Sequence, residues 1–372
     1  MAIISGGNGI RIQEIAKPII INGDMAISQR STSVSSITGS GYNTVDRWKT
    51  TIYATGTWTQ TQESLSTSDL NTTGFSKALK MDCTNEEGTL ESDDAIHLQT
   101  RLEAQDCQIF KYGTASAEKL TLSFWVKATK TGTNIVEAYQ FDDDRICCQS
   151  YTVSSSNTWE QKVLNFPADT TGVIDDNNGA GISFSFYMSA GTDYTSGTLA
   201  TTWASRTDAN RAVGQVNNAD STSNNFHITG VQLEIGEFSS STLPPFQHES
   251  YGDNLLRCQR YLAMNGNNAP ITGSCNGSAQ FNSASLWLPV SMRATPDVSN
   301  LSSIHCWFDD GTAFGDTSVS VANIKHIADT NSVYFNIDSL SGMTDNKMAS
   351  GYIGTGSDST KVQWDAELWL NQ

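Results

Sequence analysis

Charged side chains are scarce in this chain of 372 residues. Asp, Glu, Lys and Arg make up 16% of it, and 22 basic residues stand against 39 acidic ones, which gives a formal net charge of −17. Nucleic-acid binding draws much of its affinity from clustered Lys and Arg set against phosphates, and the sequence has no such cluster. We therefore exclude nucleic acid as an expected partner and interpret the acidity as a surface that resists association.

Long apolar runs and paired cysteines are also missing. No apolar run reaches the ~20 residues that a membrane-spanning helix needs, and the apolar start at residues 1–4 is too short for a secretory signal. The seven cysteines form no C-x-x-C pair, so a zinc site is not expected. We expect reduced core cysteines, with Cys147 and Cys148 on opposite faces of one strand.

Recognisable catalytic motifs are absent. There is no G-x-S-x-G elbow, and His248-Glu249 lacks the second histidine of a zinc-protease helix because Gly252 stands in its place. With 39 acids, carboxylate pairs occur by accident, so none is nominated for glycoside hydrolysis. The sequence predicts a non-enzymatic protein without catalytic residues, metal or cofactor. A structural calcium ion on the acidic runs at residues 142–144 or 175–179 is an alternative to solvated turns.

What the chain does contain favours short strands and packed cores. Hydrophobic residues make up 38% and aromatic residues 9%, which is enough apolar surface for a chain to fold. Alternate residues of Leu120–Ala128 share one apolar face, as in a half-buried antiparallel strand: Leu120, Leu122, Phe124 and Val126. Further strands are expected at residues 135–141, 159–166, 181–189 and 226–235, the last with a break near Gly230. We predict a mainly-β fold, with a jelly-roll or β-sandwich domain over residues 31–240.

Three other parts flank this domain. Residues 1–30 contain two short β-rich pieces and predict an N-terminal arm that docks onto a neighbouring protein, the alternative being an edge strand of the next domain. Residues 241–264 predict a linker and a short amphipathic helix capped by Ser250, with apolar residues at helical spacing: Tyr251, Leu255, Cys258 and Leu262. Residues 265–372 predict a second, smaller β-sandwich.

A polar stretch at residues 190–225 is long for a loop in a compact domain, which indicates a functional or disordered segment. Trp203 with Arg206 and Arg211 could line an exposed platform for sugar rings. The alternative is that Trp203 covers an edge of the sandwich.

Four segments, taken in order, resemble virion structural proteins and tail fibres of tailed bacteriophages. They are INGDMAISQRS with GYNTVDRW, LTLSFWVKAT, ITGVQLEIG with PPFQHESYGDNLLRCQRYL, and LWLPVSMRATPDV. The strands of the first domain are also similar in order to those of jelly-roll carbohydrate-binding modules. The resemblance implies a structural protein of a phage particle, a tail fibre or spike subunit that is located in the virion after assembly in the host cytoplasm. The alternatives are a head fibre or decoration protein and a virion-associated polysaccharide depolymerase.

Fibres of this kind are commonly homotrimers, and the helix would then pack at the threefold axis through Leu255, Cys258 and Leu262. If residues 1–30 dock to a tail or capsid component, the opposite end of the subunit faces outward, and that end is the second domain. Its loops place polar residues beside aromatic ones, which suits the binding of host-surface polysaccharide. The candidate glycan-binding residues are Asp309, Asp310, Phe314 and Tyr352.

Overall fold

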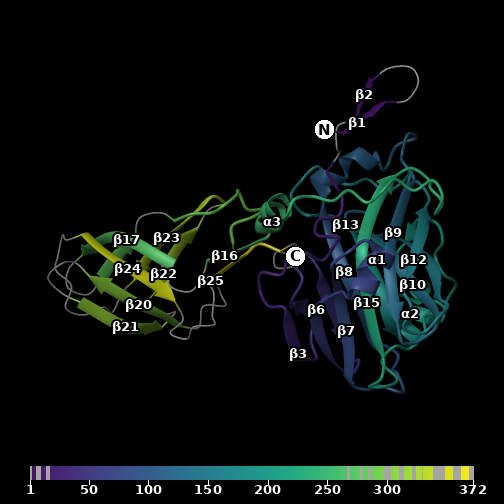
Figure 1. Cartoon of the computed structure of the whole chain (residues 1–372), viewed down its shortest axis with the longest axis horizontal. Helices are drawn as coiled ribbons and strands as arrows, with labels where there is room; N and C mark the ends of the chain where they lie inside the picture. The colour runs from purple at the N-terminus through teal and green to yellow at the C-terminus, as the bar shows by residue number, and fades with distance from the viewer. Residues whose placement is uncertain are drawn as a thin grey trace. The chain divides into compact units, whose positions relative to one another are not determined.

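The computed structural model describes residues 2–5, 10–13, 17–265, 269–276, 280–283, 286–296, 303–309, 314–320, 324–328, 330–337, 348–354 and 362–367. It confirms a mainly-β fold built from antiparallel strands with few helices (Figure 1). No helix in these ranges is long and apolar enough to cross a membrane. The chain divides into two compact units, Met1–Asn254 and Leu255–Gln372, so the division falls inside the segment predicted as the linker.

Two antiparallel sheets face each other in the first unit. The six-stranded sheet has the order β12 (Glu160–Phe166), β9 (Leu120–Ala128), β15 (Asn225–Ile235), β7 (Lys77–Asn85), β6 (Thr57–Ser64), β3 (Ser33–Ile37). The seven-stranded sheet has the order β14 (Ala204–Ser205), β11 (Arg145–Val153), β10 (Gly132–Gln140), β13 (Ala180–Ala190), β8 (Ala95–Glu103), β5 (Lys49–Tyr53), β4 (Gly41–Tyr42). The chain passes from one sheet to the other at most steps between β5 and β15, which is the connectivity of a jelly-roll sandwich.

The predicted strands of this unit are confirmed. Strand β9 has the predicted bounds, and the other four predicted strands differ from the structure by one to three residues at their ends. The expected break in β15 is a bulge, because its register with β9 shifts between Thr229 and Gln232. Alternation of apolar and polar residues placed these strands correctly because each has one face on the core.

Aromatic side chains join the two sheets. Phe124 of β9 packs edge to face on Phe186 of β13, with ring centroids 5.0 Å apart, and on Tyr151 of β11 at 5.1 Å. Leu120, Leu122, Phe124 and Val126 are all buried in the same cluster. The predicted inward face of β9 is therefore correct, and its other face carries Trp125.

Cys83, Cys107, Cys147 and Cys148 of the first unit are buried and form no disulfide, as expected. Cys147 belongs to the core between the sheets, whereas Cys148 belongs to a second, smaller cluster on the other face of β11. Burial raises the pKa of the Cys147 thiol to about 12. The thiol is therefore protonated at neutral pH and acts as a small apolar group.

Short helical segments lie between strands: α1 (Thr67–Thr73), η1 (Ala104–Phe110), α2 (Thr192–Thr195), η2 (Asp208–Asn210) and α3 (Tyr251–Gln259). The predicted cap of α3 is present, because Ser250 Oγ accepts a hydrogen bond of 3.2 Å from the Asp253 N–H. The predicted extent of this helix is too long. Leu262 begins strand β16 (Leu262–Asn265) and is not helical.

The region ahead of the sandwich is divided between a hairpin and the core. Strands β1 (Ala2–Ser5) and β2 (Ile10–Gln13) pair as an antiparallel hairpin. Ile20, Met25 and Ile27 are instead buried in the first unit. From Ile20 onward, the predicted arm of residues 1–30 is instead part of the first unit, because its apolar side chains fill the sandwich.

The second unit is also built of short strands. Its described strands form an eight-stranded antiparallel sheet and the ribbon of β16 with β25 (Val362–Asp365). The sheet has the order β19 (Leu286–Trp287), β23 (Ser332–Ile337), β18 (Gln280–Ser283), β17 (Ala269–Asn276), β24 (Met348–Gly354), β20 (Ser303–Asp309), β21 (Phe314–Ser320). The eighth strand, β22 (Ile324–Ala328), also pairs with β23.

We expect Phe124→Ala to destabilise the first unit by about 3–5 kcal/mol, because it removes a ring of one sheet that packs on two rings of the other. Chemical denaturation monitored by circular dichroism would measure the loss. Leu70→Ala is the control, since Leu70 is 41% exposed on α1 and its removal should change stability by no more than about 0.5 kcal/mol. Equal midpoints for the two variants would show that Phe124 does not join the sheets.

Candidate functional site

The candidate site begins at Trp125, on the outer face of the six-stranded sheet. Successive residues of a strand point to opposite faces, so Trp125 points away from the core that holds Phe124 and Val126. It is half-buried and pairs across the sheet with Gln161 of β12 and Thr229 of β15. Its indole N–H makes no hydrogen bond within the part of the chain that the structure describes.

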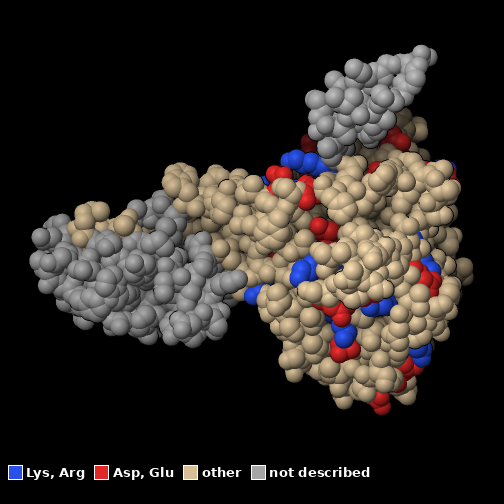
Figure 2. All heavy atoms as spheres, viewed as in Figure 1, with Lys and Arg blue, Asp and Glu red and all other residues tan. Residues whose placement is uncertain are grey.

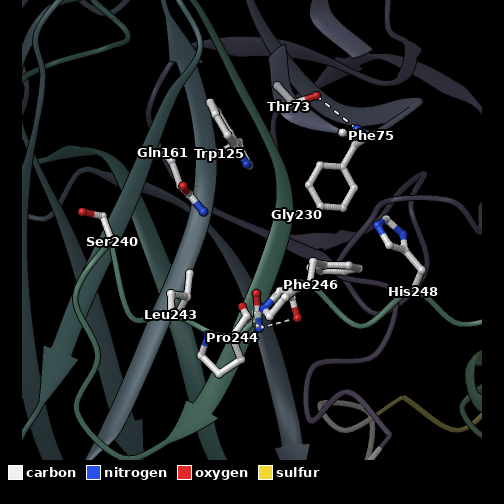
Figure 3. A pocket seen from close by; sticks show the side chains of 13 residues that line it. Thr73, Phe75, Trp125, Gln161, Gly230, Ser240, Leu243, Pro244, Phe246 and His248 are labelled. Atoms are coloured by element: carbon white, nitrogen blue, oxygen red, sulfur yellow. Dashed lines mark hydrogen bonds between the residues drawn. The ribbon is translucent and has the colours of Figure 1, made fainter. Parts of the chain in front are cut away.

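The bulge in β15 forms the floor beside Trp125. Gly230 has a φ of +60°, and a Cβ atom there would lie 2.3 Å and 2.7 Å from two ring carbons of Phe75. Only glycine combines this backbone conformation with room for a ring placed directly against it. Figure 3 shows Trp125 and Gln161 on one side of the β15 ribbon at Gly230, and Phe75 on the other.

A segment that follows β15 forms the outer wall, and we call residues 236–248 the strap. Its first part is fixed near β9 and β12, since the Phe238 N–H donates to Thr121 Oγ1 at 3.0 Å and Asn165 Nδ2 donates to the Phe238 carbonyl at 3.1 Å. Its second part is fixed to β15 by Gln232 Nε2, which donates to the Pro244 carbonyl at 3.1 Å. The wall is therefore held by hydrogen bonds at both ends.

Three rings close one end of the site. Phe75 and Phe246 meet edge to face with centroids 4.7 Å apart, and His248 lies 5.4 Å from Phe75 and 4.9 Å from Phe246. Phe75 follows the end of α1, whereas Phe246 and His248 belong to the strap. Figure 3 shows the three rings together across β15 from Trp125.

These parts enclose two adjoining hollows. The first, the aromatic compartment, has a volume of about 470 Å³ and is lined by Thr73, Gly74, Phe75, Trp125, Gln161, Gly230, Gln232, Ser240, Leu243, Pro244, Pro245, Phe246 and His248. The second, the polar compartment, has about 580 Å³ and is lined by residues 150–152, Ser154, residues 161–165 and residues 238–240. Gln161 and Ser240 line both hollows, which therefore adjoin at these two residues, and we call the two together the groove.

The electrostatics of the groove are simple. The described residues that line the groove include one basic residue, Lys162, and no Asp or Glu. The Lys162 ammonium donates a hydrogen bond of 2.6 Å to Glu160 Oε2. Figure 2 shows Lys and Arg mixed with Asp and Glu on the visible face of the first unit, with wide uncharged areas between them. The groove offers apolar rings, hydroxyls and amides to a ligand rather than a net charge.

The candidate residues from the sequence lie elsewhere. Asp309 ends β20 and pairs with Phe314, which begins β21, while Tyr352 of β24 pairs with Trp307. The backbone thus brings Asp309 and Phe314 together at one hairpin end and places Tyr352 further along the neighbouring strand. Asp310 lies outside the described residues, as do the side chains of the other three.

The three residues predicted at a trimer axis differ in exposure. Leu255 is half-buried, whereas Cys258 and Leu262 are both 0% exposed within the single chain. A side chain without exposed surface has no area left to bury against another subunit. On α3 itself, the exposed apolar side chains are Tyr251 and Leu256, at 65% and 45%.

Trp203 is half-buried and packs on the core at an edge of the sandwich, as the alternative prediction has it. Its indole N–H donates to the Pro167 carbonyl at 2.8 Å, and its ring packs edge to face on Tyr112 at 5.5 Å. Arg211 makes a forked ion pair with Glu137, with N···O distances of 2.8 Å and 2.9 Å. The Glu137 side chain is fully buried, so this pair holds the long polar loop to the seven-stranded sheet.

The carboxylates of the first acidic run accept backbone hydrogen bonds from the segment that contains the second run. Asp143 Oδ2 accepts the Val173 N–H at 2.7 Å, and Asp142 Oδ2 accepts the Asp175 N–H at 3.0 Å. Burial raises the pKa of the Asp142 carboxyl. Across the described ranges, no group of three or more His, Cys, Asp or Glu side chains is placed to hold a metal ion.

Sequence reasoning missed this groove because its lining comes from five segments that lie far apart in the sequence. The available signal was Trp125, a large ring on the outward face of an amphipathic strand, together with the PPF sequence after β15. Phe75 gave no such signal, because nothing local shows that the residue after α1 lies against a bulge about 150 residues later.

We expect Gly230→Ala to displace Phe75 and destabilise the first unit by more than the ~1–2 kcal/mol cost of a left-handed backbone alone. The matched control is Gly74→Ala, because Gly74 also has a positive φ, of +83°, but a Cβ there meets nothing within 4 Å. Thermal denaturation of both variants would separate the steric cost from the backbone cost. Equal losses would show that Phe75 does not rest on the bulge.

No protein-family model matches the chain, and no curated protein matches it. Among solved structures it is similar to the enzymatically active domain of tailspike protein 4 from bacteriophage CBA120, at 13% identity and a TM-score of 0.29 over 59% of this chain and 21% of that one. It is also similar to a putative sugar-binding protein from Bacteroides thetaiotaomicron, at 12% identity and a TM-score of 0.32 over 59% of this chain and 100% of that one. A third similar structure is the family 11 carbohydrate-binding module of Clostridium thermocellum cellulase Lic26A-Cel5E, at 14% identity and a TM-score of 0.27 over 55% of this chain and 99% of that one. The chain thus spans about a fifth of the tailspike domain. All three TM-scores are below 0.5, so these likenesses assign neither a family nor a function to this chain.

Proposed function

We propose that this chain is a non-enzymatic subunit of a bacteriophage particle, a tail fibre or spike protein, and that it binds host-surface glycan in the groove of its first unit. The observation that carries the glycan-binding part is the pairing of a half-buried Trp125 with a wall of Phe246 and His248 in an uncharged groove. A sugar ring has an apolar face and a rim of hydroxyls, and sites of this kind combine aromatic surface with a few placed polar groups.

The polar groups needed for orientation are close to Trp125. Gln161 and Ser240 are both exposed and line both compartments, and the Trp125 N–H has no partner among the described residues. The strap is fixed before any ligand arrives, because Gln232 and Asn165 already hold its carbonyls. A wall that is already ordered lowers the entropy that binding costs.

Binding without cleavage is the activity that the groove supports. Glycoside hydrolysis commonly uses two carboxyl groups that flank the scissile bond. The described residues that line the groove supply rings, amides, hydroxyls and one paired ammonium group. Such groups can hold a sugar but do not provide an acid and base pair.

The particle role rests on the sequence segments that resemble phage virion proteins. One of them, PPFQHESYGDNLLRCQRYL, contains the second half of the strap and the whole of α3. In a trimer, α3 would make contacts through its exposed Tyr251 and Leu256. The hairpin of β1 and β2 would dock to a tail or capsid component by adding its strands to a partner sheet.

We expect Trp125→Ala to lower the affinity for fragments of host-surface polysaccharide by about tenfold or more, because a ring in contact with a sugar contributes at least ~1.4 kcal/mol. Isothermal titration calorimetry would measure the affinity. Trp287→Ala is the matched control, since Trp287 is 79% exposed on β19 of the second unit. If Trp287→Ala loses binding and Trp125→Ala does not, the glycan site lies in the second unit.

We expect deletion of residues 1–16 to leave a folded trimer that no longer enters particles, because the core begins at Ile20 and only the hairpin is lost. Light scattering would give the mass of both proteins, and a complementation assay with purified virions would give incorporation. Monomeric full-length protein would refute the trimer, and normal incorporation of the shortened protein would refute docking by the hairpin. Labelling the full-length subunit in intact virions would distinguish a tail from a head location.

A further inference from the structure

The two compartments of the groove differ in chemistry, and the difference bears on which glycans it takes. The aromatic compartment is walled by Phe75, Trp125, Leu243, Pro244 and Phe246. The polar compartment lies where β12 of one sheet meets β11 of the other and is lined mainly by hydroxyl and amide side chains: Ser150, Thr152, Ser154, Gln161, Asn165, Ser239 and Ser240. A ligand that fills both must have a less polar and a more polar end.

Backbone groups add to the polar end. Strand β12 is the edge strand of the six-stranded sheet, and an edge strand presents N–H and C=O groups that no neighbouring strand takes. Residues 161–165 of this strand line the polar compartment. They can therefore offer backbone donors and acceptors to sugar hydroxyls along the length of β12.

Charge argues for an uncharged ligand. The Lys162 ammonium is paired with Glu160 at 2.6 Å, and the other oxygen of Glu160 accepts the N–H groups of Ser154 and Ser155 at 2.8 Å each. The charge of Lys162 is thus balanced by the carboxylate of Glu160. The chain carries a net charge of −17, so a polyanionic glycan would meet a repulsive field and no free cation in the groove.

Size argues for more than one sugar ring. The compartments have volumes of about 470 Å³ and 580 Å³, and each alone falls within the range of about 300–1,000 Å³ of small-molecule sites. Gln161 and Ser240 line both compartments. A single sugar ring occupies one compartment. A chain of two or more linked rings extends past Gln161 and Ser240 and occupies both compartments.

We infer that the groove selects an uncharged oligosaccharide of at least two sugar rings, with a ring that carries an apolar substituent, such as an acetyl or methyl group, in the aromatic compartment. This inference rests on the proposed glycan-binding function. Phe75, Leu243 and Phe246 would cover the apolar substituent, and β12 would meet the hydroxyls of the next ring. A protein surface made in this way discriminates by the fit of uncharged groups and not by long-range attraction.

Calorimetry with the full chain tests the inference with three series of oligosaccharides, each from one to about six rings: uncharged N-acetylated chito-oligosaccharides, uncharged malto-oligosaccharides and acidic oligogalacturonates. We expect the acetylated series to bind most tightly, with a gain of about tenfold or more from one ring to two or three. Affinity should be the same at about 50 mM and about 500 mM salt, because no charge pair forms.

Two neighbouring substitutions examine the length requirement. Ser154→Trp places a bulky ring in the polar compartment, whereas Ser155→Trp alters the next residue, which is exposed but does not line it. We expect Ser154→Trp to reduce the affinity for long oligosaccharides to that for a single ring and Ser155→Trp to have no effect. Equal affinities for one ring and six, unchanged by Ser154→Trp, would overturn the length requirement.

The remaining outcomes separate this inference from the proposed function. Tight, salt-sensitive binding of oligogalacturonates that Trp125→Ala abolishes would overturn the preference for uncharged sugars and would leave the groove a glycan site. Preference for the malto series over the acetylated one would overturn the role given to the apolar substituent. If neither these series nor host polysaccharide binds at all, the proposed glycan-binding function itself fails.

Discussion

The missing side chain of Gly230 is the constraint on which the groove depends. With a φ of +60° and no Cβ, this residue lets the Phe75 ring rest against the bulge of β15. Phe75 in turn supports Phe246 and His248, which belong to the strap. A larger residue at position 230 would displace Phe75, and the strap would lose the ring on which it packs. One backbone position in the sheet thus decides where a wall of the groove lies.

The two faces of β9 link stability to function. Phe124 joins the two sheets through Phe186 and Tyr151, and the next residue, Trp125, is turned outward into the groove. Because side chains alternate along a strand, the register that buries Phe124 also sets the position of Trp125. The core therefore fixes the orientation of the ring that we propose to contact sugar.

Local pattern predicted the parts of the fold in which one face is buried. Alternation gave β9 its full bounds, and the Ser250 cap gave the start of α3. Local pattern failed where the place of a segment in the fold depends on packing against residues far away in the sequence. Ile20 and Met25 were predicted to belong to an arm, because a short apolar segment has the same local pattern whether it fills a core or projects from it. Leu262 fits the helical spacing of the preceding residues, although it begins a strand. The helix ends at Gln259, and Ala366 then hydrogen-bonds to the Tyr261 carbonyl, a contact from about 100 residues away.

The site was less predictable than the fold. The reason is that different segments cover the outer faces of the two sheets, and only one of these faces keeps a groove. The outer face of the seven-stranded sheet is packed where Ile135, Ile146 and Tyr187 meet apolar residues of the long polar loop, which the buried Glu137–Arg211 pair holds in place. Breaking one partner of such a pair is costly because it leaves a buried charge alone, so this cover is not easily displaced by a ligand. The six-stranded sheet is instead crossed by a strap held by neutral side-chain hydrogen bonds from Thr121, Asn165 and Gln232, with a groove left between strap and strands. Polar composition suggested the loop as the sugar platform, but the ion pair makes it a lid on one sheet, and the aromatic surface open to a ligand lies on the other.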